Sequence, residues 1–144
     1  MLYFAYGSNL DAEQMARRCP RARIFQPATL RDYALCFVGY SAARHGAVAS
    51  VKYRKGSSTV GLVYTIDAKD LRSLDSFEGH PFVYERNRRA VVLDSGKRAV
   101  AEVYQHLDQF TFGPGQKYLE IIDRAYRDIG FDRRVLARAA KGKS

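Results

Sequence analysis

The chain has 144 residues, of which 47% are hydrophobic and 12% aromatic, and its 24 Lys and Arg residues outnumber 15 Asp and Glu residues for a net charge of +9. This length and composition predict one globular domain and exclude a chain that is disordered throughout. No run approaches the roughly 20 apolar residues that a membrane-spanning helix requires, so we expect no membrane insertion.

The positive charge has two dense clusters, Arg86-Asn87-Arg88-Arg89 and the C-terminal segment from Arg133 to Lys143. We interpret them as a solvated face and a basic tail. Steering of acidic small molecules and weak binding of nucleic acid remain alternatives that rest on charge alone. Despite the net charge of +9, nucleic acid is not the partner that we expect.

The two cysteines, Cys19 and Cys36, have no metal-ligand spacing to another Cys or His. The N-terminus lacks the charged region, apolar run and cleavage site of a signal peptide. Two cysteines without an export signal are more often reduced than bridged. We therefore expect a cytoplasmic protein with free thiols.

The first half of the chain predicts strands and one short helix. Residues 2–6 are continuously apolar, as in a buried central strand, and they stop at Gly7-Ser8-Asn9. Asp11 is the expected N-cap of a helix that ends near Cys19, before Pro20. Further strands are predicted at 33–38, 47–53 and 60–66, the last two joined by a hairpin turn at Lys55-Gly56-Ser57-Ser58.

The second half predicts a hairpin between helices. Asp67 is the expected N-cap of a short helix with Leu71, Leu74 and Phe77 on one face, which Gly79 and Pro81 end. Strands at 83–93 and 98–107 flank the turn Asp94-Ser95-Gly96-Lys97. After Phe112-Gly113-Pro114-Gly115, the longest helix is predicted from the apolar stripe Tyr118, Ile122, Ala125, Tyr126 and Ile129. Gly130 ends that helix, and Asp132 begins a last short one.

This order of elements favours an α+β fold. Strands follow one another with helices interspersed, and there is neither an internal repeat nor a regular βαβ alternation. We therefore predict a small, mixed, mostly antiparallel β-barrel flanked by helices. Residues 1–138 are expected to form the single domain, and residues 139–144 a basic, disordered tail.

Most common catalytic patterns are missing from the sequence. His45, His80 and His106 are isolated, with no carboxylate or Cys at metal-ligand spacing, so we predict no metal site. The sequence contains no glycine-rich dinucleotide or phosphate-binding loop and no Gly-x-Ser-x-Gly turn. A triad of Ser8 with a distant His and Asp stays open as a minor alternative.

Two segments remain as candidates for a site. The turn Gly7-Ser8-Asn9 offers backbone N–H groups, a hydroxyl and an amide that can hold carbonyl or carboxylate oxygens, although such a segment is often only a turn. Glu78 lies beside Phe77 at a helix end, three residues after Asp75. Desolvation there would raise the pKa of Glu78 toward neutrality. The alternative is an exposed glutamate at a helix terminus.

The two segments together resemble the γ-glutamylcyclotransferase family. The matching motifs are Tyr3-Phe4-Ala5-Tyr6-Gly7-Ser8-Asn9-Leu10 and, some seventy residues later, Leu74-Asp75-x-x-Glu78-Gly79 followed by Tyr84. The strands at 61–64 and 101–104 and the start of the long helix, Pro114-x-x-x-Tyr118, also fit the family pattern. The resemblance implies a small mixed β-barrel and the cofactor-free release of 5-oxoproline from a γ-glutamyl amine or peptide.

The resemblance also implies roles for individual residues. Glu78 corresponds to the catalytic acid and base, and the substrate-binding residues would be Tyr3, Tyr6, Gly7, Ser8, Asn9, Leu10, Tyr84 and Tyr104. No metal or cofactor is implied, and the protein is expected to be a monomer or homodimer. The chain departs from the family at Gly115 and Tyr126, which would change the leaving group if they lined the pocket. A non-catalytic binding or interaction module of the same fold is the alternative.

Overall fold

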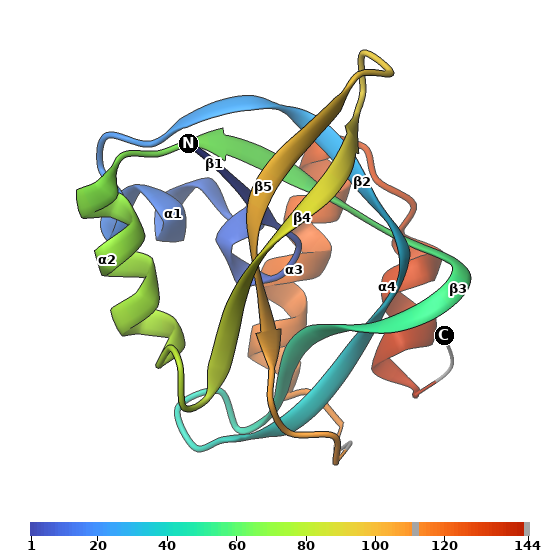
Figure 1. Ribbon diagram of the computed structural model, residues 1–144. Coiled ribbons are helices and arrows are strands. Elements are labelled where there is room, and N and C mark those ends of the chain that lie inside the picture. Colours follow the sequence, from blue (N-terminus) through green and yellow to red (C-terminus); the bar gives the residue numbers. More distant parts are fainter. Residues whose placement is uncertain (111–112, 143–144) are drawn as a thin grey trace.

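A computed structural model describes residues 1–110 and 113–142 of the chain. Its strands form a closed barrel in the order β1-β3-β2-β4-β5, with helices packed around it (Figure 1). The predicted α+β barrel is therefore confirmed. In chain order the elements are β1 (Leu2–Ala5), the 3-10 helix η1 (Ser8–Leu10), α1 (Ala12–Arg18), β2 (Arg23–Ser41), β3 (Gly46–Thr65), α2 (Ala68–Glu78), β4 (Tyr84–Leu93), β5 (Arg98–His106), α3 (Gln116–Ile129) and α4 (Arg133–Ala140).

The barrel is mixed but mostly antiparallel. Strands β2 and β3 form a long antiparallel pair, β4 and β5 form the predicted hairpin, and β1 runs antiparallel to β3. The short β1 also pairs with β5 in parallel, at Tyr3 opposite Glu102, and this pairing closes the barrel. As the central buried strand, β1 carries the chain directly to the turn at Gly7.

The predicted hairpin at Lys55-Gly56-Ser57-Ser58 is wrong. Strand β3 continues through these residues, and the chain reverses instead between Ser41 and Gly46. Gly56 has a φ of 88°, and its N–H donates to Asp32 Oδ1 at 2.9 Å across a bulge in β2. The glycine therefore allows a sharp bend of a twisted strand rather than a reversal. Strand β2 pairs with β3 on both sides of this bend, so β2 is much longer than the predicted strand at 33–38.

The predicted helix caps are confirmed. The Asp11 side chain accepts from the Gln14 N–H, and Asp67 and Asp70 form a reciprocal capping box at the start of α2. Gly79 ends α2 with a φ of 65°, in the left-handed conformation that glycine adopts without strain. This cap fixes the backbone immediately after Glu78, the candidate acid and base.

Helix α3 packs its predicted stripe into the core, with Tyr118, Ile122, Ala125 and Tyr126 buried. Helix α4 packs against β2, and residues 139 and 140, which the sequence assigned to the tail, form its last turn with Ala139 buried. Of the motif before α3, Phe112 lies outside the described residues, as do residues 143 and 144 of the tail. None of the helices in the described ranges combines the length and the apolar character needed to cross a bilayer.

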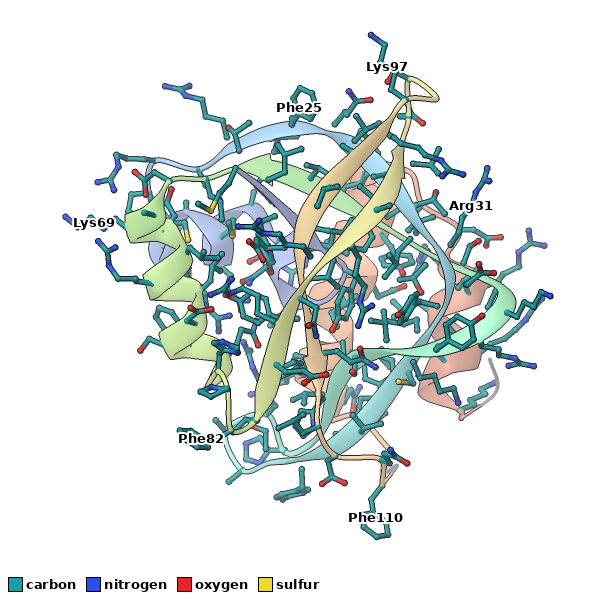
Figure 2. The ribbon with its side chains drawn as sticks, viewed as in Figure 1. Phe25, Arg31, Lys69, Phe82, Lys97 and Phe110 are labelled. Carbon is teal, nitrogen blue, oxygen red and sulfur yellow. The ribbon has the colours of Figure 1, made fainter. Side chains whose placement is uncertain are left out.

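Positive side chains extend from several faces of the molecule. Arg31, Lys69 and Lys97 are exposed on β2, on α2 and at the β4–β5 turn, and Figure 2 shows them projecting away from one another. Phe82 and Phe110 are also exposed, at the lower edge of the same view. The charge is thus distributed over the surface.

Candidate active site

A cavity of about 370 Å³ lies where the end of β1 meets the end of α2. Its walls come from residues in segments 3–9, 40–44 and 76–79, together with residues from α1, β3, β5 and α3 and from the start of β4. The first segment holds the Gly7-Ser8-Asn9 turn and the third holds Glu78, so the barrel brings together the two parts that the sequence paired.

The structure places nearly all predicted site residues around this cavity. The lining includes Tyr3, Tyr6, Gly7, Ser8, Asn9, Glu78, Tyr84 and Tyr104. Leu10 does not line it, because its side chain is only 3% exposed and belongs to the hydrophobic core. Burial of this apolar side chain anchors η1 to the core and leaves Ser8 and Asn9 at the cavity.

The turn after β1 is held by a network of side chains. Gln14 Nε2 donates to Ser8 Oγ at 2.7 Å and to Asn9 Oδ1 at 2.9 Å, and Asn9 Nδ2 donates to the Tyr3 hydroxyl at 2.9 Å. The first hydrogen bond of η1 runs from the Leu10 N–H to the Gly7 carbonyl. The N–H groups of Ser8 and Asn9 precede it and are not used inside the helix. They can donate to an oxygen atom of a ligand.

Glu78 is the last residue of α2 and is half-buried. Burial raises its pKa to about 7, while the positive charges of Arg18 and Arg44 act in the opposite direction. Its position at the negative end of the helix dipole also disfavours the charged form. Within residues 1–110 and 113–142 its carboxyl group has no hydrogen-bond partner. Glu78 can therefore exchange a proton with a ligand near neutral pH.

Asp75, one turn before Glu78, has the opposite character. Arg86 donates to both of its oxygens, at 2.8 and 3.1 Å, and the Tyr104 hydroxyl donates to Oδ1 at 2.6 Å. Burial acts to raise the pKa of Asp75, but these hydrogen bonds outweigh it and hold the pKa below its usual value. The pKa of Glu78 is thus raised and that of the neighbouring Asp75 is lowered. Near neutral pH, Glu78 can gain or lose a proton, whereas Asp75 stays charged.

We expect Asp75→Asn to reduce stability because it removes the carboxylate that accepts two hydrogen bonds from Arg86, whose other ionic partner, Glu102, lies at 3.2 Å. Charged hydrogen bonds of this kind contribute about 1–3 kcal/mol, so the free energy of unfolding in urea should fall by that amount. The pKa of Asp75 is lowered in the folded state, so its contribution is present at neutral pH and is lost as the pH falls below about 4. The exposed Asp128→Asn is the control, and equal losses in the two variants would contradict this role.

Sequence reasoning missed several residues of the lining, among them Arg18, Arg44, His106 and Tyr118. Tyr118 was predicted as part of an apolar stripe, and its hydroxyl accepts the Ala49 N–H at 2.8 Å. Arg18 donates to Asn9 Oδ1 at 3.2 Å. Nothing in the sequence distinguishes these arginines from the others, because their role depends on the fold.

Other His, Cys and Ser side chains in the described residues were considered as metal ligands or nucleophiles. The described ranges contain no cluster of three His, Cys, Asp or Glu side chains that could hold a metal ion. Cys19 and Cys36 are free and buried, and burial raises the pKa of both thiols, which makes them poor nucleophiles. No histidine within the described residues is hydrogen-bonded to the Ser8 hydroxyl, so the triad alternative has no support.

Comparison with known proteins finds a matching family model, related sequences and similar solved structures. The family model described as Gamma-glutamyl cyclotransferase, AIG2-like, matches residues 3–124. The Gamma-glutamylcyclotransferase of Homo sapiens is 32% identical over 135 residues and that of Bos taurus 31% over 134, and each match covers 90% of this chain and 71% of the relative. A solved structure of a Gamma-glutamyl cyclotransferase is 28% identical to this chain and aligns with it at a TM-score of 0.89. The alignment covers 100% of this chain and 88% of the chain in that structure. The residues matched by the family model include the whole cavity lining.

Proposed function

The chain belongs to the gamma-glutamyl cyclotransferase, AIG2-like family, and on this premise we propose that it cyclises the γ-glutamyl group of a small γ-glutamyl amine or peptide. The products are 5-oxoproline and the free amine. The observation that carries the proposal is Glu78, a carboxyl group with a pKa of about 7 in a cavity that is also lined by Ser8 and Asn9, whose N–H groups are not used inside η1. The proposed reaction uses no cofactor.

The first step is removal of a proton from the substrate. The α-amine of a γ-glutamyl group is mostly an ammonium ion at neutral pH and cannot attack until it loses a proton. In the proposal the Glu78 carboxylate accepts that proton. The free amine then lies within the same molecule as the γ-glutamyl carbonyl, so a folded pose in the cavity replaces a bimolecular encounter.

The second step forms the ring. The amine nitrogen attacks the γ-glutamyl carbonyl carbon, and negative charge develops on the carbonyl oxygen. The N–H groups of Ser8 and Asn9 are suited to stabilise this charge, for which a single donor typically contributes about 3–4 kcal/mol. The bond to the leaving nitrogen then breaks as the protonated Glu78 gives its proton to that nitrogen. The ionised Glu78 next accepts the remaining extra proton of the ring nitrogen and passes it to the free amine, which leaves as an ammonium ion. No water is consumed, and Glu78 ends the cycle ionised.

The cavity tyrosines have structural hydrogen bonds of their own. The hydroxyls of Tyr6 and Tyr84 donate to the carbonyls of Tyr104 and Ala49 at 2.6 and 2.7 Å. Burial raises the pKa of Tyr6 and of Tyr84, so both stay neutral. We propose that they bind substrate through the faces and edges of their rings and keep the cavity rigid, rather than by proton transfer.

The direct test is a panel of γ-glutamyl amino acids, peptides and amines, with formation of 5-oxoproline measured by mass spectrometry. Turnover of at least one compound supports the proposal. Binding of these compounds without any turnover would instead favour the non-catalytic module of the same fold. If the protein neither binds nor turns over any of these compounds, both the enzyme and the binding module are contradicted.

We expect kcat/KM to rise with pH through about 7, because the base is the ionised form of Glu78, whose pKa burial raises to about 7. Below this pH the carboxyl group is protonated and cannot accept the α-ammonium proton. The measurement is a kcat/KM profile from acidic to mildly alkaline pH. A flat profile across neutrality would show that a group with an ordinary carboxyl pKa is the base.

A further inference from the structure

Gln14, on α1, is a buried polar residue that the proposed mechanism does not use. It is only 6% exposed, and it does not itself line the cavity. At the third position of a helix, glutamine often bonds back to the N–H of the N-cap residue. Here the Asp11 N–H donates to the Ser8 carbonyl instead, which leaves the Gln14 side chain for other partners. A buried amide is stable only when its polar groups are hydrogen-bonded.

The side-chain hydrogen bonds of Gln14 all go to residues that line the cavity. Its Nε2 donates to Ser8 Oγ at 2.7 Å and to Asn9 Oδ1 at 2.9 Å, and its Oε1 accepts from Arg44 Nη2 at 2.8 Å. These bonds join α1 to the turn after β1 and to the turn between β2 and β3. Both hydrogens of the amide are used, so the side chain has one defined position.

Two arginines fix the direction of these hydrogen bonds. A guanidinium group can only donate, so Arg44 requires the oxygen of the Gln14 amide on its side. In the same way, the donation from Arg18 identifies the Asn9 atom that faces Gln14 as Oδ1. Gln14 Nε2 therefore faces Ser8 with a hydrogen, and the Ser8 hydroxyl accepts it. The hydrogen of that hydroxyl meets no acceptor in the described part of the chain, so it can be donated to a ligand oxygen in the cavity.

We infer that Gln14 is a positioning residue for the proposed reaction, because its amide holds the Ser8 hydroxyl as a hydrogen-bond donor toward the γ-glutamyl carbonyl oxygen. This inference rests on the proposed function. The hydroxyl is turned before the ligand binds, so no reorganisation is needed when negative charge develops on the carbonyl oxygen. Gln14 itself touches no reacting atom, and its effect passes through the residues that it holds.

The test uses two variants of similar size, each measured on the alkaline plateau of its own pH profile, where Glu78 is ionised. Gln14→Met lacks all three hydrogen bonds. Gln14→Glu keeps a partner for Arg44 but cannot donate, so the Ser8 hydroxyl must turn its hydrogen toward the introduced carboxylate and away from the ligand. We expect kcat for 5-oxoproline formation to fall about 10- to 100-fold in both variants, as for a misplaced donor, with KM changed far less.

A double-mutant cycle with Ser8→Ala checks that Gln14 acts through the hydroxyl. Once the hydroxyl is absent, Gln14→Glu should lower kcat little further, so the loss in the double variant should be far below the product of the two single losses. Gln105→Met is the matched control. Gln105 also accepts from an arginine, Arg89, but it lies outside the lining of the candidate active site, so this variant should keep its kcat.

Gln14→Glu retains an ionic partner for Arg44, so we expect it to fold, and unfolding in urea checks this for each variant. Full kcat in the folded Gln14→Glu, a loss confined to KM, or independent effects of Gln14→Glu and Ser8→Ala would overturn the inference while the proposed function stands. Loss of the native fold in Gln14→Glu would make Gln14 a structural residue and would overturn it as well. If no γ-glutamyl compound yields 5-oxoproline, the proposed function itself fails, and the inference with it.

Discussion

Glu78→Gln is expected to reduce 5-oxoproline formation by at least about 10²- to 10⁴-fold, the range typical for loss of a general acid–base group. The amide keeps the shape of the side chain but cannot accept the α-ammonium proton or return one to the leaving amine. The effect should fall on kcat, because the N–H groups of Ser8 and Asn9 remain to bind substrate. The measurement is the steady-state rate on whichever γ-glutamyl compound the unaltered protein turns over.

The same variant provides its own folding control. The pKa of Glu78 is about 7 in the folded protein against 4.5 in the unfolded chain. As the pH rises between these values, the unfolded chain releases its proton first, so this group lowers the stability of the folded state. Glu78→Gln lacks this effect and should have a Tm at pH 8 no lower than that of the unaltered protein. A folded Glu78→Gln that keeps full activity would contradict the proposed role of Glu78 as acid and base. The control Glu120→Gln, at an exposed position, should change neither the activity nor the Tm.

The sequence was most informative where a local pattern dictates local geometry. Asp11 and Asp67 have the side chains that cap helices, and the structure shows both as caps. The apolar run at 2–6 predicted a buried strand, which the barrel places between β3 and β5. Because the turn after this strand and Glu78 come from separate segments, only the family resemblance linked them before the structure brought them together.

Features that depend on distant partners were less accessible. Lys55-Gly56-Ser57-Ser58 has the composition of a reversal, but pairing along the whole of β2 keeps β3 continuous there. The sequence places Asp75 three residues before Glu78 but does not show that Asp75 pairs with Arg86 and Tyr104. Each outcome is decided by residues on another strand, which a single sequence does not reveal.

The two departures from the family pattern do not line the cavity. Tyr126 is fully buried in the core, and its hydroxyl has no hydrogen-bond partner in the part of the chain that the structure describes. Gly115 precedes α3 and packs against the turn between β2 and β3, on which Arg44 lies. Gly115 therefore bears on the cavity indirectly, through the position of that turn.

Gly115→Ala is expected to destabilise the protein by about 3 kcal/mol or more, at the upper end of overpacking effects. A Cβ atom at this position would lie 2.1 Å from the carbonyl oxygen of Arg44 and 3.0 Å from that of His45. Both are backbone atoms, so no side-chain rotation relieves the clash. The φ of Gly115 is −62°, which any residue adopts, so the cost comes from the close approach and not from backbone strain.

The clash requires the turn and the start of α3 to separate, and this movement carries Arg44 with it. Because Arg44 lines the cavity, we expect Gly115→Ala to lower kcat/KM for the γ-glutamyl compound that the unaltered protein turns over, as well as the free energy of unfolding. Gly113→Ala is the control, because a Cβ atom there meets nothing within 4 Å. Unfolding in urea and the steady-state rate of 5-oxoproline formation measure the two effects separately. If Gly115→Ala unfolds like Gly113→Ala, the close packing of the turn against α3 does not hold in solution. If Gly115→Ala is destabilised but keeps its full kcat/KM, the turn does not shape the cavity.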